Sequence, residues 1–114
     1  MSQGWIPQSG DFIFIDFDPQ AGREQAGHRP ALVLSQGAYN GKAGLAIVCP
    51  ITSQVKGYPF EVPIPHGQKI TGVVLSDQVK CVDWKVRRAR FVQTAPRNVI
   101  DTVRQHIALI LGIQ

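Results

Sequence analysis

Short apolar runs alternate along this chain with polar segments that are rich in glycine and proline. Residues 12–17 (FIFIDF) are rich in β-formers and precede the turn signal Asp18-Pro19, so they predict a strand. The uninterrupted apolar run at residues 45–51 predicts a strand buried on both faces, whereas residues 36–44 form a connection with room for one short helical turn. The same criteria predict further short strands at residues 31–34, 60–62, 72–75, 79–82 and 91–92.

The C-terminal segment has a helical period instead. Apolar residues recur at helical spacing from Val99 to Leu111, after Pro96, which suits a first helical turn. Gly112 then suits the helix end, and the apolar stripe is expected to pack in the core or in a dimer interface. Several short strands and one terminal helix predict a mainly β, α+β fold. We expect a small, strongly bent β-barrel with a C-terminal amphipathic helix packed on it, in a single domain over residues 1–114.

Composition narrows the class of protein. A chain of 114 residues has room for one domain, and 44% hydrophobic with 18% charged residues excludes a disordered protein. No apolar run approaches the ~20 residues of a membrane helix, and residues 1–5 lack the order of a signal peptide. We therefore expect a cytoplasmic protein with no membrane partner. Cys49 and Cys81 lie in apolar runs without CxxC spacing, so both are expected to be unpaired small hydrophobes, and no metal site is expected.

Positive charge is concentrated at the C-terminal end. Residues 80–114 carry seven Lys or Arg against two Asp or Glu, whereas residues 1–79 carry five against six. Such a segment is either a solvated face or a surface that binds a polyanion such as nucleic acid, and charge alone leaves both open. The candidates for contacts to a nucleic-acid backbone are Lys56, Lys80, Arg87, Arg88 and Arg90.

A polar loop between the first two predicted strands concentrates chemical groups. Residues 20–28 have no apolar period, and Glu24, His28 and Arg29 lie within six residues of each other. One interpretation is a surface loop with a Glu–Arg ion pair worth under ~1 kcal/mol. The other is a phosphoryl-transfer site, because metal-free RNA cleavage needs a base, a cation on the phosphate and an acid. Glu24 is the candidate for the base, and Arg29, whose planar guanidinium can bind two phosphate oxygens, is the candidate for the cation.

A threonine adds a possible phosphate ligand. Thr52 ends the apolar run and precedes the loop at residues 53–58. It is either an ordinary β-former or, if it faces Arg29, a hydroxyl that fixes the phosphate for attack.

These stretches together resemble the MazF/PemK family of toxin endoribonucleases, and most closely its MazF branch. The resemblance covers most of residues 10–112 in the right order. Its matching stretches are Gly10-Asp11, Asp16-Phe17-Asp18-Pro19, Gly22 with residues 24–30, Leu34-Ser35, Pro50-Ile51-Thr52, residues 56–62, Gly72-Val73 and Asp77-Gln78-Val79-Lys80.

The resemblance implies a fold, an activity and partners. The fold is an SH3-like barrel with a C-terminal helix, assembled as a homodimer. The activity is metal- and cofactor-independent cleavage of single-stranded RNA, above all mRNA, at a short motif, with 2′,3′-cyclic phosphate and 5′-hydroxyl products; it inhibits translation and growth. The implied partner is the cognate antitoxin of a type II toxin–antitoxin system, expected to carry an acidic, partly disordered tail; DNA is reached only through the antitoxin complex.

The resemblance also assigns roles to single residues. Arg29 and Thr52 match the family's catalytic pair, and Glu24 matches its acidic residue. Some members use an Arg and an Asp two residues apart, but here Leu75 stands at the place of the arginine, which favours Glu24 over Asp77 as the base. The expected RNA-binding residues are Phe17, Gln25, His28, Lys56, Tyr58, Asp77, Gln78 and Lys80.

Two other functions fit a barrel of this kind. One is a toxin that poisons DNA gyrase through protein contacts, with its functional residues on the terminal helix. The other is a non-catalytic SH3-like module that only binds a peptide or nucleic acid. The apolar tail at residues 108–114 resembles packing surface, which disfavours the gyrase poison.

Overall fold

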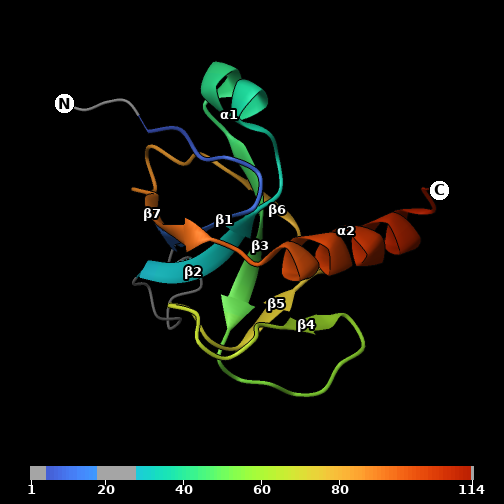
Figure 1. The fold of residues 1–114 in the computed structure, drawn as a ribbon. Coiled ribbons are helices and arrows are strands. Elements are labelled where there is room, and N and C mark those ends of the chain that lie inside the picture. The colour runs from blue at the N-terminus through green and yellow to red at the C-terminus, as the bar shows by residue number, and fades with distance from the viewer. Residues whose placement is uncertain (1–4, 18–27, 114) are drawn as a thin grey trace.

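The computed structural model describes residues 5–17 and 28–113 (Figure 1). Seven strands and two helices lie in these ranges, and the predictions for Glu24, Gln25 and the Asp18-Pro19 turn concern residues outside them. The elements, in chain order, are β1 (Asp11–Asp16), β2 (His28–Val33), α1 (Gly37–Ala43), β3 (Ala46–Thr52), β4 (Glu61–Pro63), β5 (Val73–Leu75), β6 (Lys80–Val82), β7 (Arg90–Thr94) and α2 (Arg97–Leu111).

All strand pairs are antiparallel, and the strand order is β4-β5-β3-β2-β1-β7, with β6 also paired to β3. β3 holds two neighbours on one side, because Thr52 pairs with Val73 of β5 at one end and Val48 pairs with Lys80 of β6 nearer the other. The sheet is therefore strongly curved, as Figure 1 shows. The predicted α+β class and bent sheet are confirmed. Within the described residues β4 and β7 do not pair with each other, so the barrel remains open.

The curved sheet divides the core into two clusters. Along β1, Phe12 packs in the cluster under α2, whereas Ile13 and Ile15 pack in the cluster around Trp84, since successive side chains of a strand face opposite sides. Val99 and Val103 of α2 are buried in the first cluster. The last turn of α2 extends away from the sheet (Figure 1), and its apolar residues are exposed: Leu109, Ile110 and Leu111.

Several local expectations need correction. The connection at residues 36–44 holds a seven-residue helix, because the buried side chain of Asn40 donates hydrogen bonds to the Pro7 and Ser35 carbonyls. Cys81 is exposed and not packed like a hydrophobe, since it lies on β6, which pairs with β3 alone. Cys49 is buried, and both thiols are free as expected. The run at residues 45–51 is not buried throughout, because Leu45, Ile47 and Pro50 are only half-buried.

Candidate active site

Two neighbouring strand ends bring the expected catalytic pair together. Arg29 lies near the start of β2, and Thr52 is the last residue of β3. Ala31 pairs with Pro50 in this antiparallel ladder, so both side chains lie at the same end of the two strands. Arg29 and Thr52 are half-buried, which leaves their polar ends accessible.

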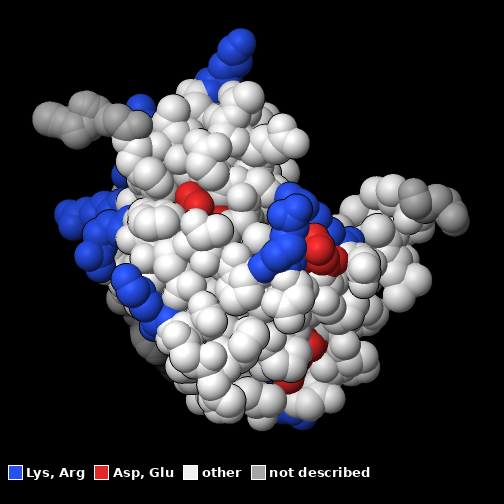
Figure 2. Space-filling view, in the orientation of Figure 1, with Lys and Arg blue, Asp and Glu red and all other residues white. Residues whose placement is uncertain are grey.

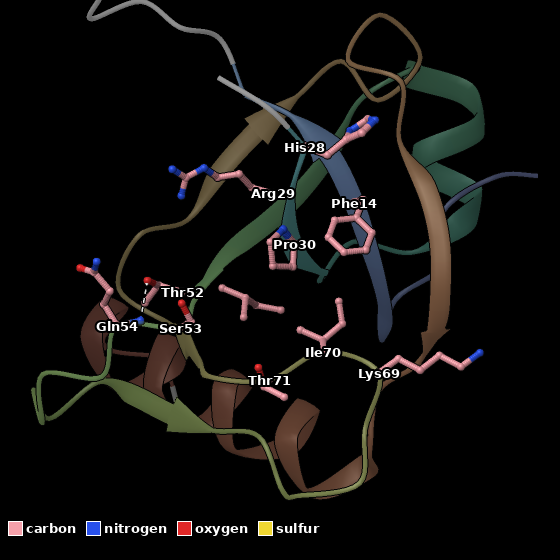
Figure 3. Close-up of a pocket in the computed structure, with 11 residues that line it drawn as sticks. Phe14, His28, Arg29, Pro30, Thr52, Ser53, Gln54, Lys69, Ile70 and Thr71 are labelled. Carbon is pink, nitrogen blue, oxygen red and sulfur yellow. Dashed lines mark hydrogen bonds between the residues drawn. The ribbon is translucent and has the colours of Figure 1, made fainter. Parts of the chain in front are cut away.

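Both residues line one open pocket of about 680 Å³ (Figure 3). Figure 3 shows Arg29 and Thr52 on one side of the pocket and Lys69 on the other. Phe14, Pro30 and Ile70 lie between these two sides. The pocket thus joins an apolar floor to a rim of hydroxyl, amide and cationic groups. Its lining residues are Phe14, His28, Arg29, Pro30, Ile51, Thr52, Ser53, Gln54, Lys69, Ile70 and Thr71.

The position of Thr52 is fixed by its neighbours in the chain and by β5. Its Oγ1 accepts the backbone N–H of Gln54 at 3.1 Å, which turns the chain as β3 ends. Gly72, with φ of +114°, packs so closely that a Cβ there would lie 2.1 Å from the Thr52 carbonyl oxygen. Only glycine allows this approach, so the Gly72-Val73 motif holds the hydroxyl beside the pocket.

His28 is a strand residue and not, as expected, part of the loop. It opens β2, and Figure 3 shows its ring directed away from Arg29. Its Nδ1 lies 2.9 Å from Oδ1 of Asp16, the residue that it pairs with on β1. Its ring also contacts Phe14, with centroids 6.4 Å apart. The carboxylate and the ring together hold the imidazole at the edge of the pocket.

The loop after Thr52 carries two more expected RNA-binding residues. The Glu61 carboxylate accepts the backbone N–H groups of Lys56 and Gly57, at 3.2 and 2.9 Å, and so closes this loop. The side chains of Lys56 and Tyr58 are exposed on it, outside the lining of the pocket. Glu61 therefore stabilises the conformation of the loop that carries Lys56 and Tyr58.

The remaining expected RNA-binding residues gather elsewhere. The Nζ of Lys80 lies 5.2 Å from the ring centroid of Phe17, a cation–π contact. Asp77 and Gln78 are exposed in the turn between β5 and β6. Lys80 pairs with Val48 of β3. Val48 lies four residues before Thr52, so the two positions are roughly 13 Å apart along the extended strand. These four residues form a surface separate from the pocket, and Glu24 and Gln25 lie outside the described residues.

Sequence reasoning missed one whole side of the pocket. Lys69, Ile70 and Thr71 come from the connection between β4 and β5, where the sequence analysis placed no functional residue. The local signal that was available is Ile70, an apolar residue within a polar turn, which is 3% exposed. Phe14, Ser53 and Gln54 also line the pocket without having been expected there.

Within residues 5–17 and 28–113, His, Cys, Asp and Glu side chains form no cluster that could hold a metal ion. None of the helices in that part of the chain is long and apolar enough to cross a membrane.

Comparison with known proteins defines the class. The sequence pattern of the PemK-like, MazF-like toxins of type II toxin–antitoxin systems matches residues 8–111, which defines the chain as a toxin of this class. Two curated relatives agree. The chain is 45% identical over 112 residues to the endoribonuclease toxin MazF of Escherichia coli K12, covering 98% of this chain and 100% of MazF. It is 32% identical over 108 residues to the Escherichia coli endoribonuclease PemK, covering 91% and 81%.

Solved structures agree with the sequence match. The MazE–MazF structure (Form-II) from Deinococcus radiodurans superposes with a TM-score of 0.91 at 47% identity, covering 97% of this chain and 100% of the other. The MazF structure (Form-I) from the same organism gives a TM-score of 0.88 at 47% identity, covering 96% and 100%. The chain belongs to the PemK/MazF family of toxins.

Proposed function

We propose that this chain, an endoribonuclease toxin of its family, cuts single-stranded RNA, above all mRNA, with Arg29 and Thr52 at the scissile phosphate. The cut is sequence-specific, needs no metal ion or cofactor, and inhibits translation and growth. The observation that carries the proposal is that Arg29 and Thr52 converge on one side of the same pocket. A planar guanidinium beside a hydroxyl suits the oxygens of a phosphodiester.

The reaction is a transfer within the RNA. The ribose 2′-oxygen bonds to the adjacent phosphorus and gives up its proton to a base, for which Glu24 is the candidate. The bond from phosphorus to the 5′-oxygen breaks, and that oxygen leaves as a hydroxyl after it gains a proton. Arg29 stabilises the charge that builds on the phosphate, while Thr52 orients it. The products are a 2′,3′-cyclic phosphate and a 5′-hydroxyl.

RNA binding is proposed to extend beyond the pocket. His28 borders the pocket, and Lys56 and Tyr58 stand on the adjoining loop, where an exposed tyrosine ring can stack on a base for ~1–3 kcal/mol. A second group of residues, with the unplaced Gln25, is proposed to contact RNA further along: Phe17, Asp77, Gln78 and Lys80.

The proposed partners are a second copy of the chain and an antitoxin with an acidic, partly disordered tail. Leu109, Ile110 and Leu111 are 46–70% exposed in the isolated chain, which supports their burial in a homodimer. The Deinococcus radiodurans relative has been solved as a MazE–MazF structure, which supports a cognate antitoxin here. We further propose that the protein acts in the cytoplasm and reaches DNA only through the antitoxin complex.

The test is to incubate the purified protein with a long RNA in EDTA. New 5′-hydroxyl ends are expected, and Arg29→Ala and Thr52→Ala are each expected to abolish them while leaving the fold intact. Arg97→Ala is the matched control, because that side chain is 80% exposed on α2 and away from the pocket. A pocket variant that cuts as fast as the parent would refute the assignment. Binding without cutting would indicate a binding module, and stalled DNA supercoiling would indicate a gyrase poison.

A further inference from the structure

The side of the pocket opposite the catalytic pair carries a cation of its own. Lys69 is exposed and lines the pocket across from Arg29 and Thr52 (Figure 3). It precedes Ile70, which is 3% exposed and belongs to the core, so the backbone at this point is anchored. Lys69 therefore belongs to a fixed rim.

A glutamine of β7 holds this rim in place. The side-chain oxygen of Gln93 accepts the backbone N–H of Lys69 at 2.7 Å. The Nε2 of Gln93 donates to the side-chain oxygen of Gln68 at 2.8 Å and to the Thr94 carbonyl at 3.0 Å. One amide thus ties β7 to a connection more than twenty residues away in sequence. The amide oxygen accepts and the amide nitrogen donates, so replacing either group should displace the backbone at Lys69.

A second cation approaches the same floor from β7. On β1, Phe14 pairs with Pro30 of β2 on one side and with Arg90 of β7 on the other. The guanidinium carbon of Arg90 lies 6.0 Å from the centroid of the Phe14 ring, which lines the pocket. Neighbouring strands lie about 5 Å apart, so Arg90 stands at the edge of the floor, one strand beyond Phe14.

Neither cation has an ion-pair partner among the described residues. The ion pairs His28–Asp16 and Arg97–Asp101 lie in residues 5–17 and 28–113, and neither Lys69 nor Arg90 takes part in them. Figure 2 shows basic side chains gathered along the edge of the molecule where Figure 1 places β7. The potential at this edge therefore favours an anionic ligand.

We propose that Lys69 and Arg90 form a second phosphate-binding subsite for the nucleotide next to the cut, and that Gln93 is a positioning residue for Lys69. This inference rests on the proposed function. The apolar floor of Phe14, Pro30 and Ile70 takes the face of the intervening base, since aromatic and apolar side chains stack on bases of any sequence. An apolar floor between two cationic sides matches a base between two phosphates. The Asp and Glu side chains of an acidic protein segment carry no aromatic ring to fill the floor, so we favour RNA.

The first experiment measures steady-state cleavage of a single-stranded RNA by Lys69→Met and Arg90→Met. Each is expected to raise KM about 3- to 10-fold with kcat within about 2-fold, the effect of losing one charged contact. The slope of log affinity against log salt should fall by about 0.7 per cation removed. Lys42→Met is the control for Lys69, because Lys42 is exposed on α1 and does not line the pocket. Arg97→Met is the control for Arg90, and both controls should cut like the parent.

The second experiment locates the phosphate. Oligonucleotides carry one neutral methylphosphonate linkage at successive positions on either side of the cut. At one flanking position the neutral linkage should raise KM for the parent at least as much as Lys69→Met does, because it removes the charge that both cations contact. At that position Lys69→Met should add no further increase, because the contact is already lost.

The third experiment tests the positioning role. Gln93→Leu should raise KM as Lys69→Met does, and the double variant should be no worse than either single one. Gln93→Glu keeps the oxygen that accepts the Lys69 N–H and should restore part of the loss. Gln105→Leu, an exposed glutamine on α2, is the matched control.

The outcomes separate this inference from the proposed function. If the parent does not cut RNA in EDTA, the proposed function fails. If the parent cuts, and both cation variants have the parental KM whichever linkage is neutral, the subsite is refuted while the proposed function stands. If the variants keep their KM for RNA but lose affinity for an acidic peptide of Asp and Glu, the surface binds protein and the inference is wrong. A Gln93→Leu effect that adds fully to that of Lys69→Met would refute the positioning role.

Discussion

Replacing Gly72 by alanine tests how the end of β3 is held beside the pocket. At φ of +114° an L-residue is strained, which costs of order 1–3 kcal/mol. The new Cβ would also meet the backbone of Thr52 and Ser53: the Thr52 carbonyl oxygen at 2.1 Å, its carbon at 2.8 Å and the Ser53 Cα at 3.0 Å. Ordinary contact begins at about 3.4 Å, so the chain must move by roughly 1 Å. Because backbone cannot rotate away as a side chain can, the displaced group is Thr52 itself.

The expected result of Gly72→Ala is a loss of both stability and activity. The melting temperature should fall by roughly 4 °C for each kcal/mol lost. A shift of about 1 Å at a catalytic group can cost on the order of 100-fold in rate, and we expect such a fall in kcat for RNA cleavage at a temperature where the variant is folded. Differential scanning fluorimetry and an end-labelled RNA assay measure the two effects.

Gly44→Ala is the matched control. Gly44 also has a positive φ, +72°, but nothing lies within 4 Å of a Cβ there, and the residue ends α1 away from the pocket. It should lose stability by strain alone and keep its kcat. If Gly72→Ala keeps the parental kcat, or if its kcat falls no further than that of Gly44→Ala, then the close packing of Gly72 does not position Thr52.

Two further predictions concern single groups outside the site. Arg88 has φ of 56°, a left-handed conformation that costs a non-glycine residue roughly 1–2 kcal/mol, so Arg88→Gly should raise the melting temperature by a few degrees; a fall would show that the turn is unstrained. Burial, with a smaller contribution from the charge of Asp77, raises the pKa of the Cys49 thiol to about 12, so this thiol stays protonated and unreactive from pH 7 to pH 9. In a thiol-labelling assay on the folded protein, one group per chain, Cys81, should react over that range, and rapid labelling of Cys49 would contradict this.

The fold follows from the sequence where local pattern and tertiary position agree. The run at residues 12–17 is apolar because both faces of β1 meet core, so its strand was predicted within one residue. β7 was predicted only at residues 91–92 but spans Arg90–Thr94, because an edge strand needs little apolar surface and ends in Gln93 and Thr94. The helix α1 was reduced to a turn, since its stability comes from the buried side chain of Asn40 and not from helix-forming residues.

The site was predictable where it is built from strand ends. Arg29 and Thr52 carry recognisable chemistry at the boundary of an apolar run, and antiparallel pairing brings such boundaries together. Lys69 has no such signal, because its destination depends on a hydrogen bond to Gln93 that no local pattern encodes. The roles of Arg29 and Thr52 rest on the family resemblance, and the structure adds the residues on the opposite side of the pocket, Lys69, Ile70 and Thr71.

The floor of the pocket is the outer surface of the core. Ile51 and Ile70 are each 3% exposed and belong to the cluster that packs under α2, and Phe14 packs against that cluster. Close packing of this kind gives a rigid platform at no cost in buried charge, because the cations stand on the rim and keep their contact with water. In the proposed reaction the Arg29 guanidinium is therefore brought to the scissile phosphate while the neighbouring nucleobase is held by residues that the fold needs in any case. Recognition of the neighbouring nucleotide then depends on how the rim is tied down, which in this chain is the task of Gln93.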